Sequence, residues 1–175
     1  MTIYSHVFSS DIKIKYNGVF IGWPLASNVI RGHSVRNTFG MVRKNLDGTP
    51  RAHQGWDFYA PVGTELRSVS DGEVVHVSER GALGLMLVVT IGNGGMFAAY
   101  CHLSEVDVAV GDNVNLGQVI GKTGATGNAS GLPVADSHLH FEVRTEPLPG
   151  LGLAGRVSPI TIFGVCPLLE AIENE

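Results

Sequence analysis

Cysteine is scarce in this 175-residue chain, which contains only Cys101 and Cys166. Two thiols are too few to indicate an oxidising compartment, and we expect both to be free. Residues 1–16 lack the basic start and the unbroken apolar run of a secretory signal. No apolar run in the chain is long enough to cross a bilayer, so the sequence predicts no membrane span.

Charged residues are also few, at 16% of the chain, and the formal net charge is −4. A chain with this net charge lacks the excess of basic residues that attracts nucleic acid or an anionic membrane surface, and we expect neither as a partner. Basic residues do gather before residue 53, and we expect them to form a solvated face. They are Arg31, Arg36, Arg43, Lys44 and Arg51.

Apolar residues are plentiful by contrast, at 44%, and the chain is long enough to bury a continuous core without disulfide bonds. The 23 glycines and the many β-branched residues favour short strands joined by tight turns over long helices. We therefore predict an all-β, mainly antiparallel domain, a sandwich or a partly open barrel, with long loops around a cleft and little helix.

Alternation and turn signals place the expected strands along the chain. Residues 11–23 predict a hairpin around Asn17-Gly18, a pair that favours a type I′ turn. Residues 24–50 show no clean period and predict an irregular approach to the core. Further strands are expected at residues 65–69, 73–77, 85–91, 96–103 and 137–145, a turn-and-strand group at 106–121, a Gly-rich loop at 123–135 and a short helix at 168–173.

The segment His138-Leu139-His140-Phe141-Glu142 carries the first candidate metal ligands. Alternate residues of a strand share a face, so His138, His140 and Glu142 point one way and the apolar residues between them point into the core. One imidazole can bind a metal ion while its neighbour reaches the substrate, but the spacing does not say which. Two solvent-facing histidines on an amphipathic strand are the competing interpretation, and we expect Glu142 to be a surface carboxylate.

A second cluster, His53 and Asp57, favours the metal site. In a fully extended strand, residues four apart lie about 13 Å from each other, which is awkward for two ligands of one ion. A curl or bulge between them is needed, and Gly55 is the residue that permits it. One carboxylate and two imidazoles form an established zinc-binding set that leaves a fourth position open for catalysis. A structural hydrogen bond between His53 and Asp57 is the alternative.

His102 ends a third segment, residues 98–102. Alternation predicts that Tyr100 and His102 share one face and that Cys101 lies on the other, in the core. No feature predicts a lowered thiol pKa, so Cys101 is not expected to be a nucleophile. The three remaining histidines lack acidic or histidine neighbours at useful spacing and are assigned no role; they are His6, His33 and His76.

These clusters and the segments between them form one ordered pattern. It consists of His53-x-x-x-Asp57, Ala60-Pro61-Val62-Gly63-Thr64, Asp71-Gly72, Tyr100-Cys101-His102-Leu103-Ser104, Gly111-Asp112-x-Val114-x-x-Gly117-Gln118-x-Ile120-Gly121, Thr123-Gly124-Ala125-Thr126-Gly127 and His138-Leu139-His140-Phe141-Glu142. Over roughly residues 40–146 this pattern resembles the lysostaphin-like (LytM-type) zinc endopeptidases, which cleave short peptides in bacterial peptidoglycan.

The resemblance implies one zinc ion, held by His53, Asp57 and His140, with His138 and His102 as the two catalytic histidines. The implied reaction is hydrolysis of a stem or cross-bridge peptide of peptidoglycan by a metal-activated water. The histidines would carry the proton transfers, because no HExxH glutamate is present.

The resemblance also implies an organisation for the chain. Residues 36–175 would form the zinc peptidase domain with its Gly-, Pro- and Leu-rich tail, and residues 1–35 a hairpin and approach segment packed on the same core. Residues 128–137, which include Asp136, form a longer loop than the compact family pattern and are expected to shape the cleft. Residues 147–175 contain no motif that assigns them a role.

Two other functions stay open from the sequence. A catalytically silent relative could serve as a scaffold or activator of cell-wall amidases, but it should lack one of the five motif residues. A biotinyl- or lipoyl-type carrier would share the turn around Gly111-Asp112, with Lys122 as the nearest lysine, but the histidine pattern would then have no explanation.

The expected place of action is the periplasm or cell wall. Because no secretory signal is visible, we expect delivery there by a secretion apparatus or a phage, as a cell-wall-degrading toxin or lysin. A cognate immunity protein would then be a further partner.

Overall fold

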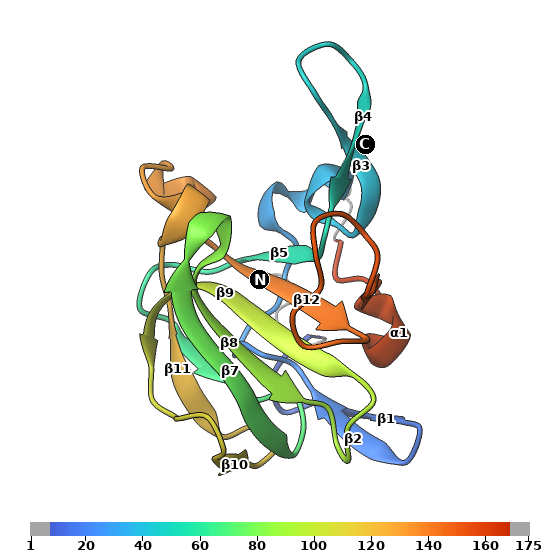
Figure 1. Cartoon of the computed structure of the whole chain (residues 1–175), viewed down its shortest axis with the longest axis vertical. Coiled ribbons are helices and arrows are strands. Elements are labelled where there is room, and N and C mark those ends of the chain that lie inside the picture. Colours follow the sequence, from blue (N-terminus) through green and yellow to red (C-terminus); the bar gives the residue numbers. More distant parts are fainter. Residues whose placement is uncertain (1–7, 169–175) are drawn as a thin grey trace, which may run out of the picture.

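The structure, a computed structural model, describes residues 8–168 of the chain. Within these residues it is almost entirely antiparallel β-structure, and the sheet does not close into a barrel (Figure 1). Helix is limited to one α-helical turn and short 3₁₀ segments, which confirms the predicted fold class. None of the described helices is long and apolar enough to cross a membrane. The helix expected at residues 168–173 lies, beyond Leu168, outside the described part of the chain.

A nine-stranded sheet forms the body of the described chain, with strands in the order β10-β7-β8-β9-β11-β6. β12 joins this path at β9 and pairs along its opposite edge with β5 and β13. The strands are β5 (Trp56–Tyr59), β6 (Glu65–Arg67), β7 (Gly72–Arg80), β8 (Gly84–Thr90), β9 (Phe97–Val106), β10 (Asn113–Val114), β11 (Val119–Thr123), β12 (His138–Arg144) and β13 (Arg156–Val157). The helical segments are η2 (Arg31–His33), η3 (Val35–Asn37), η4 (Gly81–Leu83), η5 (Gly127–Ala129), η6 (Val134–Asp136) and α1 (Ile160–Phe163).

Two hairpins accompany the sheet. β1 (Lys13–Tyr16) and β2 (Val19–Gly22) pair across Asn17 and Gly18, whose φ angles of 45° and 84° suit the predicted type I′ turn. β3 (Gly40–Lys44) and β4 (Pro50–His53) form a second hairpin that projects from the body of the molecule (Figure 1). The prediction of an irregular segment at residues 24–50 is therefore wrong for β3, whose mixed polar sequence gives no alternation signal.

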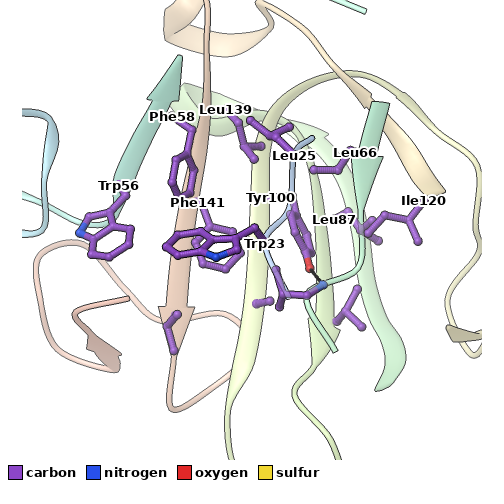
Figure 2. Close-up of a cluster of buried hydrophobic side chains, with 14 of the residues drawn as sticks. Trp23, Leu25, Trp56, Phe58, Leu66, Leu87, Tyr100, Ile120, Leu139 and Phe141 are labelled. Atoms are coloured by element: carbon purple, nitrogen blue, oxygen red, sulfur yellow. Dashed lines mark hydrogen bonds between the residues drawn. The ribbon is translucent and has the colours of Figure 1, made fainter. Parts of the chain in front are cut away.

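The apolar core gathers on one face of β9 and β12 (Figure 2). Phe141 of β12 packs edge-on against Tyr100 of β9, with ring centroids 5.4 Å apart. Trp23, just after β2, stacks on Phe163 of α1 at 4.2 Å, so segments near both ends of the described chain close on the same core. The Tyr100 hydroxyl accepts a hydrogen bond from the Val69 N–H at 3.0 Å, which satisfies this buried polar atom (Figure 2).

β9 changes partner partway along its length. Residues 97–101 pair with β12, and the strand pairs with β11 from Leu103 onward. At the change, His102 has a φ of 63°, and β9 has one residue more than β8 between Tyr100 and Leu103. This bulge breaks the alternation: Tyr100 and Leu103 both lie in the main core, and His102 turns away from it. The prediction that Tyr100 and His102 share a face is wrong for that reason, whereas Cys101 is fully buried on the other face, as predicted.

The register between β12 and β5 places His140 directly opposite Asp57. The expected break after His53 is present, because β4 ends there and β5 begins after Gly55. A Cβ atom on Gly55 would clash with the carbonyl oxygen of Phe141 in β12. The φ of Gly55 is not in the left-handed region. Glycine is therefore required here for the close approach of two backbones, and not for a special turn geometry.

Replacement of Gly55 by alanine is expected to destabilise the metal-free protein by about 1–3 kcal/mol, the usual cost of forcing an added methyl group into a packed interior. Gly150→Ala is the matched control, since a Cβ atom there meets nothing within 4 Å and its φ is ordinary. Urea unfolding of the two variants measures the difference. Equal free energies of unfolding for both would contradict the steric role of Gly55.

Candidate metal centre

Three buried side chains from β4, β5 and β12 converge at one point. His53 Nε2 lies 3.1 Å from Asp57 Oδ1 and 3.3 Å from His140 Nδ1. His140 Nδ1 lies 2.7 Å from the same Asp57 oxygen. Among residues 8–168, this is the one group of three His, Cys, Asp or Glu side chains whose donor atoms are close enough to share a metal ion.

The triangle of donor atoms has the size that zinc requires. Zinc binds histidine nitrogen and carboxylate oxygen at about 2.0–2.2 Å in a tetrahedral arrangement, so neighbouring donors lie roughly 3.3 Å apart. The two edges at His53, 3.1 and 3.3 Å, match that separation. The third edge, at 2.7 Å, is a hydrogen bond between His140 and Asp57 that an ion would replace. Three protein donors are also the number found in catalytic zinc sites, which keep a fourth position open.

Each histidine of the triangle is oriented by a contact on its outer nitrogen. His53 Nδ1 donates to the Thr38 carbonyl at 2.7 Å, which leaves the Nε2 lone pair directed at the site. His140 is reversed, because its Nε2 faces Glu142 Oε1 at 3.0 Å and its Nδ1 faces Asp57. Burial alone would lower the pKa of His140, but hydrogen bonds to the two carboxylates raise this pKa to about 9. Without metal, both nitrogens of His140 therefore carry a proton at neutral pH.

The second oxygen of Asp57 binds arginine. Arg43 Nη2 lies 2.7 Å from Asp57 Oδ2, and Arg31 Nη2 lies 3.8 Å from it. Burial would raise the pKa of Asp57, but its contacts with His140 and His53 hold this pKa well below its usual range. The expectation of a solvated basic face is wrong for Arg31 and Arg43. No residue spacing in the sequence indicates these contacts with Asp57. Arg43 reaches Asp57 only when the β3–β4 hairpin has folded.

His138 and His102 are buried beside the triangle, so all five residues singled out from the sequence come together. Their ring centroids lie 5.1 Å apart. His138 Nδ1 donates to the Asp136 carbonyl at 2.8 Å and His102 Nδ1 to the Thr126 carbonyl at 3.0 Å. A carbonyl can only accept, so Nε2 is the free acceptor in each neutral ring. Burial lowers the pKa of both rings, that of His102 to about 4, and favours the neutral forms at pH 7.

Glu142 is not the surface carboxylate that was expected. It has no exposed area, and all seven residues of β12 are buried. Its Oε2 accepts the Nε–H groups of Arg144 and Arg156 at 2.7 Å each. Burial would raise the pKa of Glu142, but His140 and Arg144 lower this pKa to about 2, so the carboxylate is ionised. Sequence reasoning missed this cluster because Arg156 lies in a segment without a motif.

The other histidines and the cysteines take no part in the triangle. His76 bonds the Ser78 hydroxyl at 2.8 Å on β7, and His33 is exposed, while His6 lies outside the described residues. Both cysteines are free, as predicted. Burial raises the pKa of Cys101 well above its usual range, which agrees with the exclusion of a catalytic thiol.

The triangle of His53, Asp57 and His140 lines a cleft of about 730 Å³. Asn128 and Leu132 contribute to its wall, which confirms that the loop at residues 128–137 shapes the cleft. Residues 148–151 line it as well. Five of the eight arginines of the chain line the cleft, and Asp57 is the one acidic residue among positions 8–168 that does so. These arginines are Arg31, Arg43, Arg51, Arg80 and Arg156.

Comparisons with known proteins agree with this geometry. Residues 51–150, which include all five site residues, match the model described as peptidase family M23. The glycyl-glycine endopeptidase ALE-1 of Staphylococcus capitis is 36% identical over 113 residues, 59% of this chain and 30% of that protein. The peptidoglycan DD-endopeptidase ShyA of Vibrio cholerae is 39% identical over 98 residues, 55% of this chain and 21% of that protein. The chain thus matches less than a third of the length of either relative.

A solved structure shows the same fold. The catalytic domain of the antimicrobial peptidase lysostaphin from Staphylococcus simulans superposes with a TM-score of 0.60 at 26% identity. The alignment covers 73% of this chain and 90% of that domain.

Zinc binding is expected to release about one proton near pH 7, because the pKa of His140 is raised to about 9 and the ion must displace the Nδ1 proton. His53, whose pKa is lowered by burial, contributes little to this release. The apparent affinity should then rise about tenfold per pH unit between pH 6 and 8 and level off above pH 9. Calorimetry in buffers of different ionisation enthalpy counts the protons. A release of zero at pH 7 would contradict a His140 that carries two protons before the ion binds.

Proposed function

The chain belongs to peptidase family M23, and from that membership we propose that it is a zinc-dependent endopeptidase that hydrolyses peptide bonds in bacterial peptidoglycan. The observation that carries the proposal is the buried triangle of His53, Asp57 and His140 with His138 and His102 beside it, in one cleft. The complete set of five residues also favours hydrolysis over the alternative of a silent activator of amidases, which should lack one of them.

The proposed metal ligands are His53 Nε2, Asp57 Oδ1 and His140 Nδ1. A zinc ion at this point would act as a Lewis acid and would lower the pKa of a coordinated water towards neutrality. Arg43 and Arg31 occupy the other oxygen of Asp57 and so restrict the carboxylate to one donor atom. The Thr38 carbonyl keeps His53 in the matching tautomer.

The proposed proton carriers are His138 and His102. His138 Nε2 lies 3.8 Å from Asp57 Oδ1, so it faces the donor triangle and can accept the proton of an attacking water. The backbone carbonyls behind both rings hold Nδ1–H in place, so that Nε2 is the atom that gains and loses the proton. A proton gained at Nε2 of either ring can then pass to the leaving amine as the peptide bond breaks.

Purified sacculi with glycine cross-bridges and sacculi with directly linked stems, each digested with the zinc-loaded protein, test the proposal. We expect new peptide termini in at least one chemotype, identified by mass spectrometry. Removal of zinc by a chelator, and His53→Ala or His140→Ala, should each lower the rate by about a thousandfold or more. His33→Ala is the matched control, because His33 is exposed and outside the cleft. Full activity of a folded His53→Ala or His140→Ala protein would refute the assigned ligands.

The charge of the cleft favours stem peptides that carry free carboxylates over uncharged glycine bridges. Arg31, Arg43 and Arg156 already contact carboxylates of the protein. Within residues 8–168, no Asp or Glu oxygen lies within 4.0 Å of a side-chain nitrogen of Arg51 or Arg80, although both line the cleft. Arg51 also stands directly across the hairpin from Arg43, an unfavourable pairing of like charges that a bound anion would relieve.

Matched stem-peptide substrates with free or amidated carboxylates measure this preference. We expect kcat/KM to be about tenfold higher for the free carboxylates, the size of one charge-assisted hydrogen bond. Arg51→Gln or Arg80→Gln should reduce the ratio and leave cleavage of the amidated substrate unchanged. Lys13→Gln, on exposed β1, is the control. Equal kcat/KM values for both substrates with wild-type protein would exclude the preference.

The proposed place of action is the cell wall or periplasm, where peptidoglycan lies. Delivery there as a toxin or lysin, by a secretion apparatus or a phage and with an immunity protein, stays a prediction. A secretion or phage gene beside the native reading frame would support it.

A further inference from the structure

The buried carboxylate of Glu142 joins the metal centre to two other parts of the structure. Oε1 lies 3.0 Å from His140 Nε2, and Oε2 lies 2.7 Å from Nε of both Arg144 and Arg156. Arg144 belongs to β12 itself. Arg156 belongs to β13, beyond the end of the family match at residue 150. These contacts join the strand that carries His140 to a segment that no motif covers.

Stability alone is a poor explanation for this cluster. Burying a carboxylate with guanidinium groups costs free energy before the groups pair, and apolar side chains of similar volume often stabilise a core equally well. The cluster makes direct contact with His140, and it satisfies the one nitrogen of that ring that faces away from Asp57. Its placement therefore points to a role in orienting His140.

The orientation of His140 differs from that of the other histidines at the site. His53, His102 and His138 all direct Nδ1 at a backbone carbonyl and keep Nε2 free. His140 has to present Nδ1 instead, which requires an acceptor for Nε2–H. Glu142 lies two residues further along β12 on the same face, where its carboxylate can reach that nitrogen.

Arg156 keeps Glu142 in a fixed position. Its Nη1 donates to the carbonyls of Gly150 and Gly152 at 2.7 and 3.0 Å, and Gln54 Nε2 donates to the Gly152 carbonyl as well, at 3.2 Å. The guanidinium is therefore held by the loop that forms one wall of the cleft. A carboxylate between this group and Arg144 has little freedom to turn away from His140.

We propose that Glu142 is a positioning residue that accepts the Nε2–H of His140 and so holds that ring in the tautomer whose Nδ1 faces the metal. This rests on the proposed function, because it takes His140 as a zinc ligand. An outer carboxylate of this kind commonly changes metal affinity by 10–100-fold. The competing role is purely structural, in which Glu142 serves only to neutralise the two arginines.

Two substitutions separate these roles. Glu142→Asp keeps the negative charge between Arg144 and Arg156 but is one methylene too short to reach His140. Glu142→Gln keeps the reach but loses the charge, and its amide oxygen can accept from the two arginines only when its NH2 group faces His140. We expect the aspartate variant to bind zinc at least tenfold more weakly than wild type. The glutamine variant should also bind zinc more weakly, because an NH2 group that faces Nε2 favours the opposite tautomer of His140, and it should unfold at a lower urea concentration.

Competition with a chromophoric chelator measures zinc affinity without any need for turnover. Nitrogen NMR shifts of the zinc-loaded wild-type protein report which nitrogen of His140 carries the proton, and we expect Nε2. Glu105→Asp and Glu105→Gln are the matched controls, because Glu105 of β9 is exposed and forms its ion pair with Lys122. Both control variants should bind zinc as tightly as wild type does.

Zinc binding by the aspartate variant as tight as that of wild type would overturn the proposal and leave Glu142 a structural counter-ion. Failure of the proposed function would be visible separately, as wild-type protein that binds no zinc or cuts no sacculi.

Discussion

The pairing of β12 with its two neighbours is the interaction on which the site depends. β5 on one edge sets Asp57 opposite His140, and β9 on the other edge ends its pairing with β12 at the bulge that carries His102. Hydrogen bonds between backbones fix this register, and a slip of one residue would turn His138, His140 and Glu142 into the core. Gly55 takes part in the same constraint, since any side chain there would strike β12.

Around that frame, the polar groups of the site hold one another in defined protonation states. Carbonyls of Thr38, Thr126 and Asp136 select one tautomer for three histidines, and the Glu142 carboxylate binds Nε2 of His140, which leaves Nδ1 facing Asp57. Burial keeps His102 and His138 neutral, so that their free nitrogens can accept protons. The Asp57 and Glu142 carboxylates stay ionised because each has cationic or hydrogen-bonding partners. Because these groups are buried, their hydrogen bonds are electrostatically stronger than they would be in water. Loss of any partner would leave a buried polar group unpaired, which costs free energy.

Much of the fold was accessible from the sequence because its signals are local. The Asn17-Gly18 turn, the alternation in β12 and the glycine-rich connections all depend on neighbours a few residues apart. The errors fall where a distant contact overrides the local pattern. β3 is a strand because β4 pairs with it, and His102 leaves the core face because β9 changes partner there. Glu142 is buried because a segment from beyond β12 brings Arg156 to it.

The sequence by itself determined the side chains on which the proposed function rests: two imidazoles and a carboxylate proposed to bind one ion, and two further histidines proposed to move protons. It also determined that His138 and His140 share a face, because alternation along a strand needs no distant partner. Only the tertiary structure decided that Nδ1 of His140 faces Asp57, that arginines occupy the other oxygen of Asp57, and that the cleft is basic in a chain of net charge −4. These features arise between segments as far apart as residues 31, 57, 140 and 156, and only strand register and burial bring such segments into contact.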